Sequence, residues 1–121
     1  MQLTLTLLSS LALVTGALAV ENPLSFTTWA CNNCASPADT VNGPCARTDH
    51  QIKQSDICIT NSPLTNKGSL VVDFAKPGCT LFLYSNSNCE GDGDQTFGFV
   101  GSNVCRPIVF GARAAYKVIC S

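Results

Sequence analysis

The chain is poor in charged residues and has no basic patch. Lysine, arginine, aspartate and glutamate together make up 12% of the sequence, and the net charge is −1. The few cations are scattered along the chain instead of being grouped. Binding to a phosphate backbone depends on clustered lysine and arginine, so we expect no nucleic-acid partner.

Residues for acid–base catalysis are also scarce. Histidine occurs once, at His50, and glutamate only at Glu21 and Glu90. A small nuclease needs an acid, a base and an arginine, and the nearest set is Arg47, Asp49 and His50. We interpret His50 as a solvated loop residue instead.

The carboxylates do not form a recognisable glycosidase pair. Such an enzyme needs two carboxyl groups at a fixed separation across a cleft. Most of the candidates lie in turns, where aspartate bonds to the local backbone; they are Asp39, Asp49, Asp56, Asp73, Glu90, Asp92 and Asp94. No Gly-x-Ser-x-Gly motif is present. We therefore expect no enzyme activity, no catalytic residue and no cofactor, with a small secreted hydrolase as the remaining alternative.

Metal-binding motifs are incomplete. Cys31-Asn32-Asn33-Cys34 has the spacing of a zinc or redox pair, but no second such pair and no following helix accompany it. We expect these two cysteines to bond to different, distant partners. The acidic stretch Glu90–Asp94 could offer oxygen ligands to Ca²⁺, but its composition is also that of a solvated turn, which we favour. We expect no metal.

The first 19 residues form an uncharged apolar block that ends in Ala17-Leu18-Ala19. Small residues at these positions are typical of signal-peptidase sites, so residues 1–19 are predicted to be a signal peptide cleaved after Ala19. Polar residues interrupt the block, and it is short for a membrane span, so no membrane anchor is expected. Residues 20–121 then form a single domain of a secreted, monomeric protein.

All eight cysteines lie after the predicted signal peptide: Cys31, Cys34, Cys45, Cys58, Cys79, Cys89, Cys105 and Cys120. An even number of cysteines in a secreted chain predicts four disulfides. Eight cysteines allow 105 pairings, and the sequence does not choose among them by itself.

Short apolar runs alternate with clusters of glycine, proline, asparagine and aspartate. They predict strands at Glu21–Ala30, Ser55–Thr60, Ser69–Phe74, Cys79–Ser85, Thr96–Val100, Val104–Phe110 and Arg113–Cys120. A short helical turn is the alternative considered for Ala46–Gln54. The fold class is therefore all-β, a small disulfide-stapled antiparallel sandwich or barrel.

Two hairpins follow from the turn residues. The turn Ala75–Gly78 is expected to pair Ser69–Phe74 with Cys79–Ser85. A second hairpin, turning at Gly111, would place Cys105 opposite Cys120 and so predicts a disulfide between them. A Cys79–Cys89 disulfide is the second predicted pair.

The stretch Tyr84-Ser85-Asn86-Ser87-Asn88-Cys89-Glu90-Gly91 resembles the signature of a β/γ-crystallin Greek key. A cysteine stands where that family usually has an aromatic residue. The resemblance covers about residues 79–120 and implies a crystallin-like Greek key. The calcium signature of that family is absent, so no metal-binding residue is carried over.

The whole chain also resembles the small secreted cysteine-rich proteins of filamentous fungi, many of which are effector candidates. The resemblance rests on the leader, the eight cysteines and phrases such as LYSNSNCEG and AYKVIC. The resemblance implies a niche but no mechanism. From the signal peptide, the disulfide density and the missing catalytic set, we expect a non-enzymatic protein whose loops bind a host or competitor molecule, an extracellular protein or a glycan. The alternative is a carbohydrate-binding, cell-wall-binding or killer-toxin-like antifungal protein, with Trp29 and Tyr84 as the candidate ligand contacts.

Overall fold

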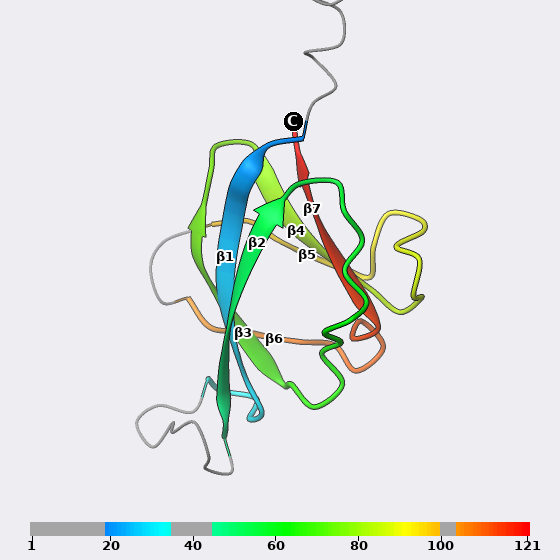
Figure 1. Cartoon of the computed structure of the whole chain (residues 1–121). Helices are drawn as coiled ribbons and strands as arrows, with labels where there is room; N and C mark the ends of the chain where they lie inside the picture. The colour runs from blue at the N-terminus through cyan, green and yellow to red at the C-terminus, as the bar shows by residue number, and fades with distance from the viewer. Residues whose placement is uncertain (1–18, 35–44, 100–103) are drawn as a thin grey trace, which may run out of the picture.

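The computed structural model describes residues 19–34, 45–99 and 104–121 as two antiparallel sheets (Figure 1). The strands are β1 Glu21–Trp29, β2 Arg47–Gln54, β3 Ser69–Ala75, β4 Cys79–Tyr84, β5 Gln95–Phe97, β6 Arg106–Pro107 and β7 Ala115–Cys120. One sheet has the order β2-β1-β3-β6 and the other β5-β4-β7. The predicted all-β fold is confirmed. The signal peptide prediction concerns residues of which all but Ala19 lie outside the described ranges.

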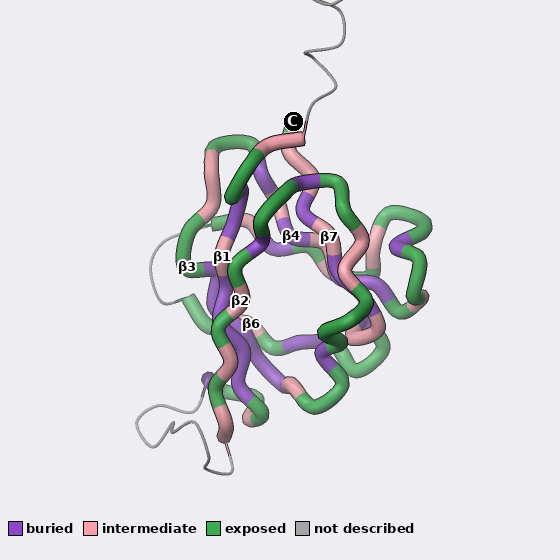
Figure 2. The backbone as a smooth tube through the Cα atoms, viewed as in Figure 1, coloured by how far each residue is buried: buried purple, intermediate pink, exposed green. Residues whose placement is uncertain are grey.

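The inner faces of the two sheets enclose one apolar core. On β1, Leu24 and Phe26 point inward, and the ring of Phe26 meets the ring of Tyr116 from β7 edge-on at 5.4 Å. The other fully buried members of the core are Leu64, Leu70, Leu81, Leu83, Ala112 and Val118. Figure 2 shows buried residues along the strands and exposed ones on the connections. Burial of these side chains on both inner faces is what pairs the sheets.

The turn at Ala75–Gly78 does not close the predicted hairpin. β3 belongs to the four-stranded sheet and β4 to the three-stranded sheet, so the turn carries the chain across the edge of the core. Leu70 of β3 and Leu81 of β4 then bury their side chains in the same cluster from the two different sheets. Gly78 has a φ of +82°, and a Cβ there would lie 2.5 Å from the carbonyl oxygen of Ser121.

The second predicted hairpin is also wrong. β6 pairs with β3, whereas β7 pairs with β4, so Gly111 again joins two sheets. The two strands on either side of it are therefore not neighbours. The same physical reason applies, because Ile108, directly after β6, and Val118 of β7 bury their side chains in one core.

The second strand lies earlier than the sequence predicts. Ser55–Thr60 contributes only an isolated bridge between Ile59 and Tyr116, while Arg47–Gln54 forms β2. Among the inward residues of β2, Thr48 and His50 are polar and only Ile52 is apolar, so a pattern based on apolar alternation misses this strand.

All eight cysteines are paired, as predicted. The disulfides are Cys31–Cys45, Cys34–Cys105, Cys58–Cys89 and Cys79–Cys120. Cys31 and Cys34 have different partners, which confirms that part of the prediction. Four disulfides in a domain of this size are consistent with an extracellular protein.

The predicted pairs Cys105–Cys120 and Cys79–Cys89 are wrong. β7 runs antiparallel beside β4, in a register that places Cys79 directly opposite Cys120. Cys105 instead lies just before β6, at the edge of the other sheet, and bonds to Cys34. The error in the Cys105–Cys120 pair thus follows from the error in the Gly111 hairpin, whereas Cys89, predicted to close the Tyr84 loop with Cys79, bonds to Cys58.

Removing the Cys79–Cys120 disulfide is expected to destabilise the domain strongly. It joins residues 41 apart, and loop-closure entropy assigns such a cross-link about 4 kcal/mol. We expect the paired change Cys79→Ser with Cys120→Ser to lower the free energy of unfolding by about 3 to 4 kcal/mol in urea titrations. An unfolding free energy within about 0.5 kcal/mol of the unchanged protein would contradict this role.

Candidate functional site

Trp29 and Tyr84, the predicted ligand contacts, lie in the interior. Trp29 is 9% exposed and packs with Val71 and the Cys34 sulfur, whereas Tyr84 is 1% exposed and packs with Cys89. Burial, and then the nearby charge of Asp92, raise the pKa of the Tyr84 hydroxyl above its usual value. Neither ring presents a face on which a ligand could stack, so their predicted role gains no support from this placement.

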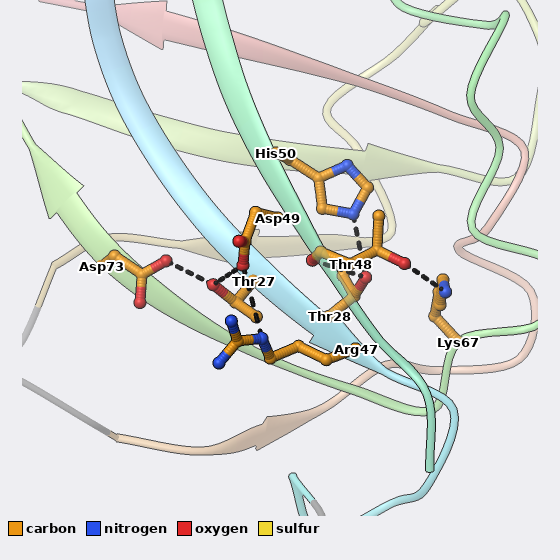
Figure 3. A network of polar contacts seen from close by, with 8 residues as sticks. All are labelled: Thr27, Thr28, Arg47, Thr48, Asp49, His50, Lys67 and Asp73. Carbon is orange, nitrogen blue, oxygen red and sulfur yellow. Dashed lines mark hydrogen bonds and ion pairs between the residues drawn. The ribbon is translucent and has the colours of Figure 1, made fainter. Parts of the chain in front are cut away.

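His50 lies on the inner face of β2 instead of in a loop (Figure 3). Its ring stacks on Phe26 at 4.4 Å between centroids, and its Nε2 lies 2.9 Å from the Thr28 hydroxyl. Next to it, the Lys67 ammonium donates to the Thr48 hydroxyl over 2.8 Å. At the margin of the core, the Thr28 hydroxyl therefore pairs with the His50 imidazole, and the Thr48 hydroxyl pairs with the Lys67 ammonium.

This environment lowers the pKa of His50 from 6.5 to about 4. Burial is the main cause, because it penalises the charged imidazolium, and the positive charge of Lys67 acts in the same direction. The carboxylate of Asp49 opposes both effects but does not outweigh them. His50 is accordingly neutral at physiological pH.

The outer face of the same sheet carries Asp49, Asp73 and Arg47. The Thr27 hydroxyl lies 2.6 Å from Asp73 Oδ2 and 3.2 Å from Asp49 Oδ1, and Arg47 Nε lies 3.7 Å from the same Asp49 oxygen (Figure 3). Neighbouring residues on a strand point to opposite faces. The nuclease set considered from the sequence is thus divided, with Arg47 and Asp49 on one face of the sheet and His50 on the other.

The Glu90–Asp94 loop forms hydrogen bonds with the residues just before it in the chain. Asp94 Oδ2 accepts a hydrogen bond from the Ser85 amide over 2.7 Å, and Asn86 Oδ1 accepts one from the Glu90 amide over 2.9 Å. Within the described ranges, no group of three or more histidine, cysteine, aspartate or glutamate side chains has the arrangement of a metal site. Asp39, a further candidate carboxylate, lies outside these ranges.

The most exposed large apolar side chain among the described residues is Phe110, at 82%. It lies in the connection between β6 and β7 beside Val109, which is 53% exposed, and the two are called the Phe110 tip here. The sequence predicts both residues in a strand. In a strand Phe110 would share a face with Ile108 and only Val109 would point away, so the sequence carries no signal for the exposure of Phe110.

The Phe110 tip is fixed by its neighbours. Ile108 and Ala112 are buried on either side of it, and the Ala112 amide donates to the Val109 carbonyl over 2.9 Å. Gln95 of β5 accepts a hydrogen bond from the Val109 amide over 2.7 Å. The tip is therefore held by both sheets, although its own side chains lie in solvent.

A cleft of about 400 Å³ adjoins the Phe110 tip. Its lining consists of Thr65, Ser85, Phe110, Gly111, Arg113 and Ala114. The Arg113 guanidinium carbon lies 5.2 Å from the centre of the Phe110 ring, and the same group bonds to the Thr65 and Ile108 carbonyls over 3.4 and 3.5 Å. An anchored cation and an exposed ring thus form one wall of the cleft.

Comparisons with protein-family models, with curated proteins and with solved structures give no match. The crystallin-like and fungal effector-like resemblances therefore stay predictions. In the described part of the chain, no helix has the length and hydropathy needed to cross a membrane.

The single histidine permits a direct test of this packing. Only one imidazole signal exists, and we expect it to titrate near pH 4 in the folded protein by proton NMR. Reduced and denatured protein should restore a pKa of about 6.5. A midpoint between 6 and 7 in the folded protein would show that His50 is solvated.

The same shift makes the domain less stable in acid. The unfolded chain takes up a proton below about pH 6.5, whereas the folded chain does so only near pH 4, so stability is lost as the pH falls through this window. Allowing for solvent screening of the half-buried ring, we expect a loss of about 1 to 2 kcal/mol. His50→Gln should remove this loss in urea titrations at pH 7 and pH 4.

Proposed function

We propose that this chain is a secreted, non-enzymatic protein that binds another extracellular protein, of a host or a competitor, through the Phe110 tip and its cleft. The observation that carries the proposal is the 82% exposure of Phe110 on a loop that is fixed on both sides. Isolated exposed apolar residues are ordinary on protein surfaces. Here Phe110, Val109 and the adjoining cleft occur together, which is typical of an interaction site.

Preorganisation supports this assignment. Binding is weakened when loops and side chains must be ordered at the interface. The Phe110 tip avoids much of this cost, because Gln95 holds its backbone and Arg113 lies over its aromatic ring. A rigid aromatic residue beside an anchored arginine has the composition of an energetic hot spot in protein interfaces.

A protein partner fits this surface better than a glycan does. Sugar rings stack on exposed tryptophan or tyrosine, but Trp29 and Tyr84 are buried. Phe110 and Val109 instead add purely apolar area at the tip, and burial of such area favours association with an apolar patch on another protein.

Secretion is supported by two independent features. The uncharged apolar leader with a small-residue cleavage motif directs a chain to the secretory route, and disulfides form there. The pairing of all eight cysteines is consistent with such an oxidising compartment, where disulfides usually persist. The non-enzymatic part of the proposal rests on the separation of His50 from Arg47 and Asp49 by the sheet.

The tip can be tested by competition. Labelled protein is first bound to immobilised extracellular proteins of a candidate host or competitor, and unlabelled variants then displace it. We expect Phe110→Ala to need at least a tenfold higher concentration for half displacement, because a central aromatic hot spot contributes about 2 kcal/mol. Protease treatment of the immobilised material should abolish specific binding.

Phe74→Ala is the matched control, because Phe74 is 49% exposed on a different part of the surface. It should compete like the unchanged protein. Equal competition by Phe110→Ala, or retention that protease does not affect, would reject the proposed protein-binding tip.

A further inference from the structure

β2 is an edge strand with a free hydrogen-bonding side. It pairs with β1 and, within the described ranges, with no other strand. The Ala30 amide donates to the Ala46 carbonyl over 3.1 Å, which fixes the hydrogen-bonding phase of this strand pair. Since that phase repeats every two residues, Thr48, His50 and Ile52 direct their backbone groups toward β1.

The alternate residues of β2 direct their backbone groups outward. In the regular part of the β1–β2 register, the amide and carbonyl of Asp49 and Gln51 therefore point away from β1. The register shifts between Glu21 and Leu24, and the Ser55 amide donates to the Val20 carbonyl over 2.9 Å, so this alternation does not extend to Lys53. Such a row of donors and acceptors is a template for pairing with another strand.

A groove of about 360 Å³ lies beside this edge. It is lined by Gln51, Lys53, Gln54, Ile57, Ile59 and Asn61, and Ile57 is 46% exposed. A strand added to β2 would lie against this groove and cover part of that apolar side chain. The edge therefore offers both backbone hydrogen bonds and apolar surface.

The charges on β2 are arranged symmetrically about Gln51. Asp49 lies two residues before it and Lys53 two residues after it, and both side chains are exposed on the outer face. Thr27 and Arg47 both contact Oδ1 of Asp49, which leaves Oδ2 available to a further cation. Charged residues usually protect an edge by repelling a like strand. This arrangement is instead self-complementary.

We propose that β2 pairs antiparallel with β2 of a second copy, about a two-fold axis at Gln51. In that register Gln51 faces its own counterpart, and Asp49 faces Lys53 of the second copy on both sides of the axis. The backbone groups of Asp49 and Gln51 point outward, as hydrogen bonding across the axis requires. Opposite charges directly across a strand pair stabilise it. The surface is separate from the Phe110 tip, and the result is a dimer where the sequence led us to expect a monomer.

Charge reversal gives a specific test. Analytical ultracentrifugation of the secreted chain should show a monomer–dimer equilibrium. Asp49→Lys alone and Lys53→Asp alone each place like charges across the axis, so we expect each variant to raise the dimer dissociation constant at least tenfold. An equimolar mixture of the two should form heterodimers, because every facing pair is then opposite in charge. The double variant should also dimerise.

Glu90→Lys is the matched control, since it makes the same charge change on an exposed loop and should leave the dimer intact. Phe110→Ala should also leave it intact, which separates this inference from the proposed function. The inference is overturned if the unchanged protein is monomeric up to about 1 mM. It is equally overturned if the single variants dimerise as well as the unchanged protein, or if their mixture does not recover the dimer.

A measurement without substitutions covers the case in which a variant fails to fold. Amide hydrogen exchange of the unchanged protein should slow at Asp49 and Gln51 as its concentration rises. Exchange at these amides that is independent of concentration, while the protein dimerises, would place the interface elsewhere.

Discussion

Packing of two small sheets across a single apolar core is the constraint on which the rest of this structure depends. Phe26 of β1 and Tyr116 of β7 meet across the core, and apolar residues from β3 and β4 complete it. A domain of this size buries a limited fraction of its surface, so the core alone provides a small margin of stability. The disulfides add to this margin by restricting the unfolded chain.

The positions of the disulfides determine which loops are free to serve a function. Cys31–Cys45 and Cys34–Cys105 pack with Trp29 at one margin of the four-stranded sheet, and Cys58–Cys89 packs with Tyr84 beside the other sheet. At these two margins, disulfides and aromatic rings therefore occupy the space between the strands and the loops. The connection between β6 and β7 contains no cysteine and is held by hydrogen bonds. Its residue Phe110 remains in solvent.

The sequence predicts strands well where inward positions are apolar and poorly elsewhere. β1, β3, β4 and β7 follow the expected alternation, because their inner residues belong to the core. β2 lacks this alternation, because its inward residues Thr48 and His50 are polar and form hydrogen bonds with Lys67 and Thr28. Turn residues report that the chain reverses, but they do not report whether it returns in the same sheet. That missing information misassigned both hairpins and, with the second one, the Cys105–Cys120 disulfide.

The candidate site was even less accessible to sequence reasoning. Rare residues such as Trp29 and His50 attract functional interpretations, yet here they fill the interior or its margin. Phe110 is conspicuous only in the structure, because β6 ends at Pro107 and the chain then leaves the strand alternation that would turn Phe110 toward the core with Ile108.

The central claim is that the two sheets are closed by this particular set of disulfides, and a non-reducing peptide map tests it most directly. Digestion with an Asp-specific protease and chymotrypsin separates Cys79 from Cys89 and Cys105 from Cys120. We expect linked peptides that join Cys79 to Cys120 and Cys58 to Cys89, with Cys105 joined to the peptide that contains Cys34. A peptide joining Cys105 to Cys120 would place β6 and β7 in one hairpin and contradict the two-sheet arrangement.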